Sequence, residues 1–284
     1  MKRNSLIICR GGGDLATGIV HRLHRAGFRV LVLETDHPAA IRRQVSFCEA
    51  VYEGKATVEG VTAQRIDSVS EMEEVFAGGC VPLFVDSKGA SIAELHPDVV
   101  VDAIIAKKNL GTTKEMAPLV IGIGPGFTAG VDVDLVIESM RGHNLARILE
   151  EGSALPNTGI PGAIAGVAKE RVIHAECAGI LYGEKKISDY VQKDEVIAFI
   201  YPDTQGKDAS GQEKKDGAFA VRATISGILR GLIRDGYPVT KGFKSADIDP
   251  RESEYENCFT ISDKARCIAG GVLEALLHAG ILPE

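Results

Sequence analysis

A glycine-rich turn close to the amino terminus has the residue types and spacing of a phosphate-binding site. Gly11, Gly13 and Ala16 match the G-x-G-x-x-G/A pattern and follow an apolar run over residues 5–9. In that pattern the first glycine permits a tight turn, the second lets a diphosphate approach the backbone, and the small third residue allows close helix packing. The amides that start the following helix would face the anion. The predicted diphosphate cradle consists of Gly11, Gly12, Gly13, Asp14 and Leu15.

A carboxylate and two arginines follow the first turn at positions that fit a nucleotide site. Glu34 ends a second apolar run, residues 28–33, about 20 residues beyond the glycines, where dinucleotide-binding proteins hold the ribose hydroxyls. Arg42 and Arg43 offer guanidinium groups for a nucleotide phosphate, although Glu34 argues against a dedicated 2′-phosphate site. These residues favour a nucleotide ligand, with NAD(P) among the candidates. The alternative is a Rossmann-like turn whose crevice is empty.

A second glycine-rich turn comes directly after the apolar run Leu119–Ile123. Gly124 and Gly126, with Thr128 close behind, are spaced to form a nest of backbone amides for a second phosphate or oxyanion. Asp132 would repel a phosphate directly, so its role there would be to hold Mg²⁺ or to accept hydrogen bonds from ribose or substrate. Downstream of this turn, Glu138, Arg141, His143 and Asn144 lie close together in the sequence; the alternative to a role in chemistry for them is a solvated helix end with caps and surface ion pairs.

A lysine is predicted at the edge of the sheet where the strands have their carboxyl ends, as are the two glycine turns. Lys107 follows the Val/Ile-rich run of residues 99–106, which has the composition of a buried parallel strand. Open α/β sheets place ligands beyond the carboxyl ends of their strands, so Lys107 is a candidate binding residue, and an ordinary surface lysine is the alternative. No residue emerges as a catalytic group. Six scattered cysteines without a C-x-x-C pair predict no protein metal site.

The elements that must position these residues alternate between strand and helix over the first part of the chain. Apolar runs of strand length, separated by helical or turn segments, predict an α/β fold with a Rossmann-like parallel sheet domain over residues 1–165. The stretch 156–162 is dense in turn residues and marks the boundary. Residues 253–284 contain a helix, capped by Ser262, that we expect to pack back on the first domain.

An internal repeat lies between these two parts. Residues 179–200 align without gaps on residues 227–248, and each copy has the pattern of a strand, a turn and a second strand. Two such units with a shared core predict a small all-β barrel-sandwich domain of the biotinyl/lipoyl-carrier type over residues 166–252. The joining segment, residues 201–220, is too long and polar for a rigid lysine-presenting turn, so we expect no modified lysine. Chance similarity between two strand-turn-strand segments is the alternative.

The composition limits the partners of the chain. A net charge of -7 without any basic block opposes binding to nucleic acid or to an anionic membrane. The apolar stretches have the length of strands, so none is expected to span a bilayer. Scattered cysteines are typical of reduced thiols, and the expected location is the cytoplasm. A homo-oligomer is compatible with all of these features.

Five longer strings of the sequence in combination resemble one known family. They are CRGGGDLATGIVHRLHRAGFRVLVLE, PAAIRRQVSFCEAVYEG, VIGIGPGFTAGVDVDLVIESMRGHNLARI, PNTGIPG and ADIDPR. With these strings the chain resembles YqeB-type accessory proteins of selenium-dependent molybdenum hydroxylase systems, which are distantly XdhC-like. The resemblance implies a role in maturing a molybdenum hydroxylase through a nucleotide or molybdopterin-type cofactor, with hydroxylase subunits or other maturation proteins as partners. It supplies no reaction and no catalytic residues.

Three functions therefore remain open at the level of sequence. The first is a non-catalytic maturation factor whose two glycine turns hold the diphosphate of a molybdopterin-type cofactor or nucleotide. The lack of an obvious general base beside Gly13 favours this function. The second is an NAD(P)-dependent oxidoreductase that acts on the cofactor or on a small substrate. The third is a scaffold for hydroxylase subunits that has no affinity for nucleotides.

Overall fold

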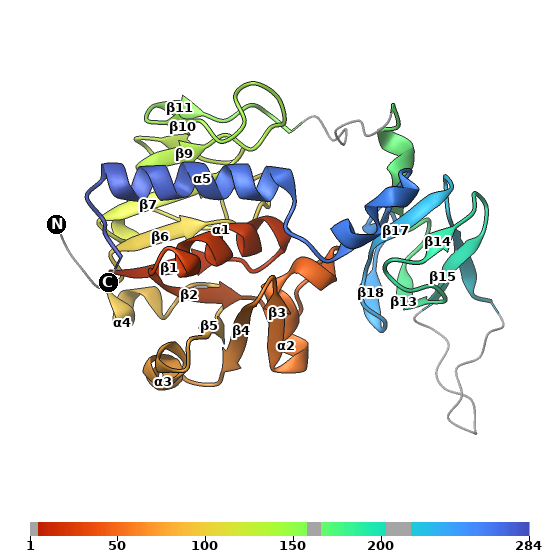
Figure 1. The fold of residues 1–284 in the computed structure, drawn as a ribbon, viewed down its shortest axis with the longest axis horizontal. Helices are drawn as coiled ribbons and strands as arrows, with labels where there is room; N and C mark the ends of the chain where they lie inside the picture. The colour runs from red at the N-terminus through yellow and green to blue at the C-terminus, as the bar shows by residue number, and fades with distance from the viewer. Residues whose placement is uncertain (1–4, 158–165, 203–216, 284) are drawn as a thin grey trace. The chain divides into compact units, whose positions relative to one another are not determined.

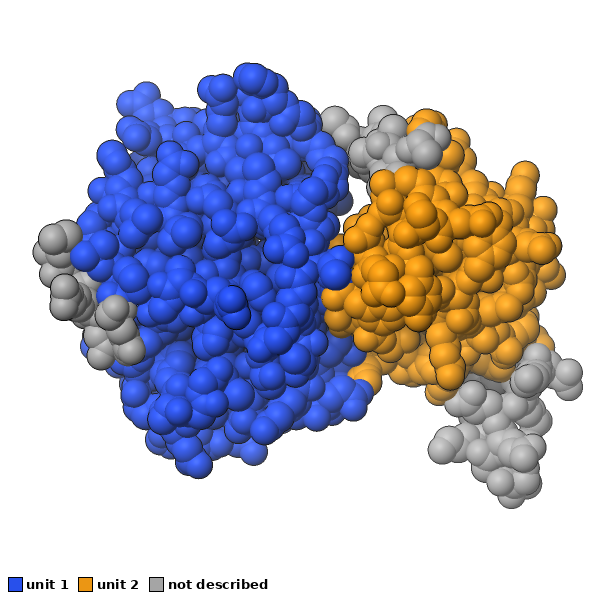
Figure 2. All heavy atoms as spheres, in the orientation of Figure 1, with its two compact units in different colours: residues 1–38, 45–158, 260–284 blue, residues 39–44, 159–259 orange. Residues whose placement is uncertain are grey.

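The computed structural model describes residues 5–157, 166–202 and 217–283 of the 284-residue chain. These residues form two compact units, which are coloured separately in Figure 2. Unit 1 comprises residues 1–38, 45–158 and 260–284, and unit 2 comprises residues 39–44 and 159–259. Most of the predicted boundary stretch 156–162, and most of the polar segment 201–220 with its lysines, lie outside the described residues.

Unit 1 is built around a nine-stranded mixed sheet (Figure 1). Its strands in spatial order are β10 (Ile148–Leu149), β9 (Leu135–Ile137), β7 (Leu119–Ile123), β6 (Val99–Asp102), β1 (Leu6–Arg10), β2 (Arg29–Glu34), β5 (Val81–Val85), β4 (Val61–Ile66) and β3 (Lys55–Val58). The strands from β9 to β4 run parallel to one another. The two outer strands, β10 and β3, are antiparallel to their neighbours.

The central strands are apolar on both faces, as parallel strands covered on two sides must be. Along β1 the side chains of Ile7 and Cys9 enter one apolar cluster, whereas Ile8 between them enters another. The same alternation holds in β2, where Val30 and Leu31 belong to different clusters. This period of two places a separate core on each face of the sheet.

Two long helices cover one face of the sheet. Figure 1 shows α1 (Asp14–Arg25) and α5 (Asp263–His278) side by side, although they come from opposite ends of the chain. Gly18 permits this close packing, because a Cβ atom there would lie 2.8 Å from the Cβ of Ala265. The Ser262 side chain caps α5 by accepting a hydrogen bond from the Ala265 amide at 3.2 Å. The remaining α-helices of unit 1 are short: α2 (Ala50–Glu53), α3 (Met72–Ala77) and α4 (Ile92–Leu95).

Unit 2 contains two four-stranded antiparallel sheets. One has the order β12 (Val172–His174), β19 (Lys244–Asp249), β17 (Gly227–Leu232) and β14 (Tyr190–Val191). The other has the order β16 (Phe219–Arg222), β15 (Val196–Tyr201), β13 (Gly179–Gly183) and β18 (Tyr237–Val239). Both sheets are made of strands from both copies of the internal repeat, since β13 pairs with β18 and β17 pairs with β14.

The predicted combination of a Rossmann-like parallel sheet and a biotinyl/lipoyl-like barrel-sandwich is wrong as a description of this fold. The sheet of unit 1 is mixed, because Glu59 and Gly60 both take positive φ and turn β3 back onto β4 as a two-residue hairpin loop. The neighbour of β2 is β5, although β4 is the next parallel strand along the chain. Unit 2 is a pair of antiparallel sheets that also takes residues 39–44 from the first part of the chain.

Candidate functional site

The first glycine turn is closed by the protein's own groups. The Gly12 amide donates a hydrogen bond to Oε2 of Glu34 at 2.7 Å, and the Gly12 carbonyl accepts one from the Cys48 amide at 2.8 Å. The Gly11 amide donates to the carbonyl oxygen of Leu33 at 2.8 Å. A Cβ atom on Gly11 would lie 3.0 Å from the Ala103 carbonyl oxygen. The glycines therefore let neighbouring loops pack closely, and the Gly12 amide is already hydrogen-bonded to the Glu34 carboxylate.

The surroundings of this turn are acidic. Burial raises the pKa of the Cys48 thiol well above its ordinary value, and the nearby carboxylates of Glu34, Glu49 and Asp14 raise it further. Burial likewise raises the pKa of Glu34, against the opposing effect of its bonds to backbone amides. Negative charge gathered around a turn opposes the approach of a diphosphate. At the start of α1, Gly13 has open space around it, and Leu15 packs against the core.

The second glycine turn also uses its glycines for packing. The Gly124 amide donates to the Ile137 carbonyl oxygen at 2.8 Å, and a side chain on Gly124 would meet Ser139. A Cβ atom on Gly126 would lie 2.7 Å from Cα of Lys108. Beyond this turn, the Thr128 amide donates to Oδ2 of Asp132 at 2.8 Å, so that carboxylate caps a local turn.

The structure does not bring all the predicted site residues together. Lys107 is exposed on the loop after β6, in a left-handed backbone conformation with φ of 63°. Arg42 and Arg43 belong to unit 2, where they donate hydrogen bonds to the carbonyl oxygens of Asn257 (3.1 Å) and Leu232 (3.0 Å). The predicted residues thus fall around the first turn, around the second turn and its neighbouring loop, and in unit 2.

A buried polar network at the carboxyl end of the sheet was missed by the sequence analysis. Arg10, at the end of β1, is only 2% exposed; it donates to the Thr112 hydroxyl and lies 3.6 Å from the Asp102 carboxylate. Thr112 in turn donates to Asp102 at 2.5 Å, and Arg10 also reaches the Ser87 carbonyl oxygen at 3.4 Å. These contacts link the loops that follow β1, β5 and β6. The network is satisfied internally, so its role is structural.

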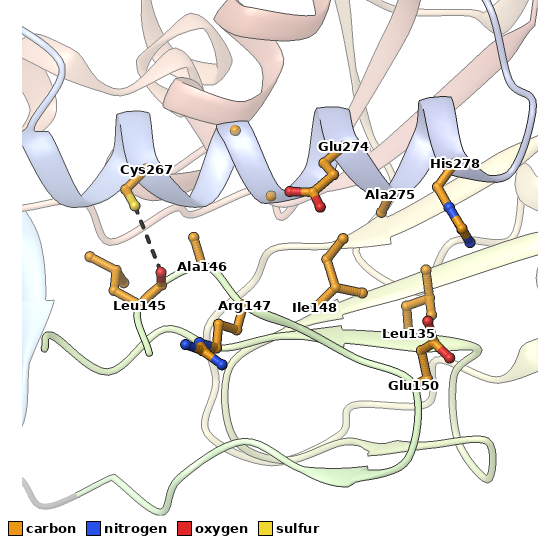
Figure 3. Close-up of a pocket in the computed structure, with 12 residues that line it drawn as sticks. Leu135, Leu145, Ala146, Arg147, Ile148, Glu150, Cys267, Glu274, Ala275 and His278 are labelled. Carbon is orange, nitrogen blue, oxygen red and sulfur yellow. Dashed lines mark hydrogen bonds between the residues drawn. The ribbon is translucent and has the colours of Figure 1, made fainter. Parts of the chain in front are cut away.

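A groove of about 670 Å³ lies between α5 and the segment that leads into β10, within unit 1 (Figure 3). We call it the α5 groove. It is lined by Leu135, Leu145, Ala146, Arg147, Ile148, Glu150, Cys267, Gly270, Gly271, Glu274, Ala275 and His278. Its surface is about equally polar and apolar, and the charged members come from both of its walls.

The α5 wall of the groove follows from helical spacing. Cys267, Gly271, Glu274 and His278 are separated by four, three and four residues and therefore share one helix face. Figure 3 shows the side chains of Cys267, Glu274 and His278 directed from α5 toward the opposite wall. A Cβ atom on Gly271 would collide with the Ala146 carbonyl oxygen, so the glycine is needed for this close approach. The sequence analysis expected this helix only to pack back on the first domain and did not use these polar residues.

The charged side chains of the groove are available to a ligand. Among the described residues, Arg147, Glu150, Glu274 and His278 form no ion pair and no side-chain hydrogen bond with the rest of the protein. The Cys267 thiol donates a weak hydrogen bond to the Leu145 carbonyl oxygen at 3.8 Å. No group of three or more His, Cys, Asp or Glu side chains in the described part of the chain is arranged to hold a metal ion. The arrangement suits recognition of opposite charges along a partly apolar surface.

Comparison with known proteins gives one close relative in sequence. No family model matches the chain. The chain is 44% identical over 281 residues to YqeB of Escherichia coli (strain K12), which is described as an uncharacterized protein. The match covers 98% of this chain and 49% of YqeB, so the chain spans about half the length of that relative. The predicted resemblance to YqeB is confirmed, and the distant XdhC-like relationship stays a prediction.

The similar solved structures are remote. The Ectoine utilization protein EutE (DoeB) from Ruegeria pomeroyi is 10% identical, with a TM-score of 0.27 and coverage of 87% of this chain and 86% of that chain. A succinylglutamate desuccinylase from Silicibacter sp. TM1040 is 12% identical, with a TM-score of 0.26 and coverage of 87% and 85%. An aspartoacylase family protein from Mesorhizobium loti is 9% identical, with a TM-score of 0.29 and coverage of 88% and 86%.

The closed glycine turns correct the predicted function. Because the protein's own groups fill both turns, the function is wrong in its two forms that bind a nucleotide there, the maturation factor and the NAD(P)-dependent oxidoreductase. The similar structures are of desuccinylase and aspartoacylase type. Similarity at these TM-scores gives no activity to this chain. The predicted partner proteins stay predictions. None of the described helices has the length and apolar character needed to cross a bilayer.

Proposed function

We propose that this chain binds a small elongated zwitterion in the α5 groove. The observation that carries the proposal is a groove lined by aliphatic and charged side chains, in which Arg147 on one wall and Glu274 on the other form no ion pair among the described residues. Its volume of about 670 Å³ falls within the range of small-molecule sites, roughly 300 to 1,000 Å³. Sites of this kind hold a ligand by its apolar body and fix its orientation with a few polar groups.

The side chains define the chemistry of the ligand. Arg147 offers a planar guanidinium, which binds a carboxylate through two parallel hydrogen bonds. Glu274, on the opposite wall, offers a carboxylate for an ammonium group. Leu145 and Ile148, which also line the groove, provide apolar contact for a methylene chain. The ligand class is therefore a carboxylate and an amine joined by an aliphatic spacer.

The length of the groove favours an extended ligand over a compact one. Cys267 and His278 lie at opposite ends of the α5 wall, eleven residues or about 16 Å apart along the helix axis. An α-amino acid with an uncharged side chain carries its ammonium and its carboxylate on the same carbon and cannot contact both walls through separate ends. An ω-amino acid can, since its charges are at the two ends of its chain.

The test is calorimetric titration with ε-aminocaproate, hexanoate and hexylamine. We expect ε-aminocaproate to bind more tightly than either singly charged analogue. Arg147→Gln should weaken its binding about tenfold, the effect of losing a charge-assisted hydrogen bond. Glu256→Gln, an exposed charge in unit 2, is the matched control and should leave the affinity unchanged. Equal affinities for all three compounds, or an unchanged affinity in the Arg147 variant, would overturn the proposal.

A further inference from the structure

The segment containing residues 39–44 joins unit 2 by pairing with the end of β17. The Leu232 amide donates to the Ile41 carbonyl oxygen at 2.8 Å, and Nε of Arg43 donates to the Leu232 carbonyl oxygen at 3.0 Å. Gly231 lies between these contacts, and a Cβ atom there would lie 3.0 Å from the Ile41 carbonyl oxygen. The absence of a side chain at Gly231 lets the segment approach, and this approach brings Arg42 next to β17, which carries Arg230.

Arg42 and Arg230 converge on one buried place. Cys258 is 1% exposed, and burial raises the pKa of its thiol, while the positive charges of Arg230 and Arg42 act in the opposite direction. A terminal nitrogen of Arg42 donates to the carbonyl oxygen of Asn257, the residue before Cys258, at 3.1 Å. Cγ of Arg42 lies 3.4 Å from the position of a Cβ atom on Gly231, the residue after Arg230. Their side chains are themselves largely buried, at 8% exposed for Arg42 and 12% for Arg230.

The nearby carboxylate of Asp249 is already engaged by another arginine. Arg251 donates to both oxygens of Asp249, from Nε at 2.9 Å and from a terminal nitrogen at 2.8 Å. Arg230 lies farther away, with 3.7 Å between its terminal nitrogen and Asp249. These contacts hold the pKa of Asp249 below its ordinary value despite its burial. Asp249 is thus ionised and hydrogen-bonded mainly to Arg251, and its contact with Arg230 is longer.

Arg230 retains an unused hydrogen-bond donor inside the protein. Its Nε is buried and has no hydrogen-bond partner among the described residues. Leaving such an N–H donor unsatisfied in the interior is costly. An oxyanion placed beside Arg230 would accept this hydrogen bond, and its charge would be opposite to the charges of Arg230 and Arg42.

We propose that Arg230, together with Arg42, binds a compact oxyanion, a carboxylate or a phosphate group, in unit 2. This site is independent of the α5 groove, which belongs to unit 1. Planar guanidinium groups match the paired oxygens of both anion types, so the side chains alone do not choose between them. The site contains no glycine turn and is defined by arginines that come from two distant parts of the sequence.

Thermal unfolding in inorganic phosphate, sodium acetate and sodium chloride at equal ionic strength tests this site. We expect phosphate or acetate to raise the Tm of the wild-type chain more than chloride does, and the comparison of the two identifies the preferred anion. Arg230→Gln should abolish that additional shift, whereas Arg230→Lys, which keeps the charge but not the planar fork, should retain part of it. Arg222→Gln, an exposed arginine on β16, is the control and should behave as wild type.

Direct titration keeps the proposal testable if the Arg230→Gln variant does not fold. Calorimetric titration of the wild-type chain with inorganic phosphate and with acetate should detect binding. This binding should persist in a sodium chloride buffer whose ionic strength equals that of the titrated salt. Equal Tm values in all three salts together with no heat of binding would overturn the proposal. The same salt-specific shift in a folded Arg230→Gln variant would also overturn it.

Discussion

The Glu34 carboxylate accepts a hydrogen bond from the Gly12 amide at 2.7 Å, within the turn where a ligand diphosphate was expected. The same carboxylate accepts a second bond from the Thr35 amide, also at 2.7 Å. Burial nevertheless raises the pKa of Glu34 above its ordinary value of 4.5, because desolvation outweighs the two bonds that favour the ionised form. The Glu34 side chain thus fills the turn, and burial disfavours its ionised form.

Glu34 should make the stability of the chain depend on pH. Since its folded-state pKa is raised, this contribution to the free energy of unfolding is fully present below about pH 4.5 and is lost as pH rises through the folded pKa. Glu34→Gln removes the titration and keeps an oxygen acceptor for Gly12. We subtract the free energy of unfolding of the variant, measured in urea, from that of the wild-type chain. This difference should fall as pH rises from 4.5 toward neutrality. A difference that rises with pH would contradict the direction of the pKa shift.

Two glycines of the first turn should differ in their tolerance of a side chain. Gly11 has φ of 100° and lies against the Ala103 carbonyl, so Gly11→Ala should cost about 1 to 3 kcal/mol of stability. Gly13 is the N-cap of α1, with φ of -66° and no atom within 4 Å of an added Cβ. Gly13→Ala should cost less, about 0.5 kcal/mol, because an added Cβ meets nothing and the loss is limited to the preference for glycine over alanine at an N-cap. Denaturant unfolding of both variants measures the difference, and equal costs would mean that Gly11 is not packed as described.

The two copies of the repeat predict equal effects at equivalent glycines. A Cβ atom on Gly179 would collide with the Tyr201 carbonyl oxygen, and one on Gly227 would collide with that of Asp249. Gly179→Ala and Gly227→Ala should therefore each destabilise unit 2, by amounts that agree to within about 1 kcal/mol. Chemical denaturation followed by tyrosine fluorescence provides the measurement. A large effect at one site alone would show that the copies are not energetically equivalent.

The local strands and helices could be predicted from the sequence. Whether the glycine turn binds a ligand or packs against the protein could not. The apolar run before Gly11 forms β1, and Ser262 caps the helix that begins at Asp263, because these preferences act between neighbouring residues. The partner of the Gly12 amide is 22 residues away, and no spacing rule distinguishes a ligand from Glu34. The same glycine pattern is compatible with binding a phosphate and with close packing of neighbouring loops.

The hairpin and the groove were missed for different reasons. The β3–β4 hairpin depends on positive φ at Glu59, a residue type not typical of that conformation. The α5 groove depends on contacts between segments that are far apart, as with Cys267 and Leu145, which are separated by 122 residues. Helical spacing does place Glu274 and His278 on one face, but it does not show which segment lies opposite them.

Adjacent glycines of α5 should respond to alanine in opposite directions. Gly270 lines the α5 groove and has no atom within 4 Å of an added Cβ, so Gly270→Ala should stabilise the chain by about 0.5 to 1 kcal/mol through helix propensity. Gly271→Ala should destabilise it, because the new methyl group would collide with the Ala146 carbonyl oxygen. The two Tm values provide the test. A stabilising Gly271→Ala would mean that α5 does not approach this wall closely.

Occupation of the α5 groove should protect the Cys267 thiol from alkylation. Cys267 is the exposed member of the six cysteines and lines one end of the groove, whereas Cys80 and Cys177 are only partly accessible. If the proposed zwitterion binds along the groove, saturating ε-aminocaproate should slow the reaction of Cys267 with a maleimide several-fold. Peptide mass spectrometry gives the rate at each cysteine. Cys177, in unit 2, is the internal control, because its rate should not change. An unchanged Cys267 rate at saturation would place the ligand outside this end of the groove.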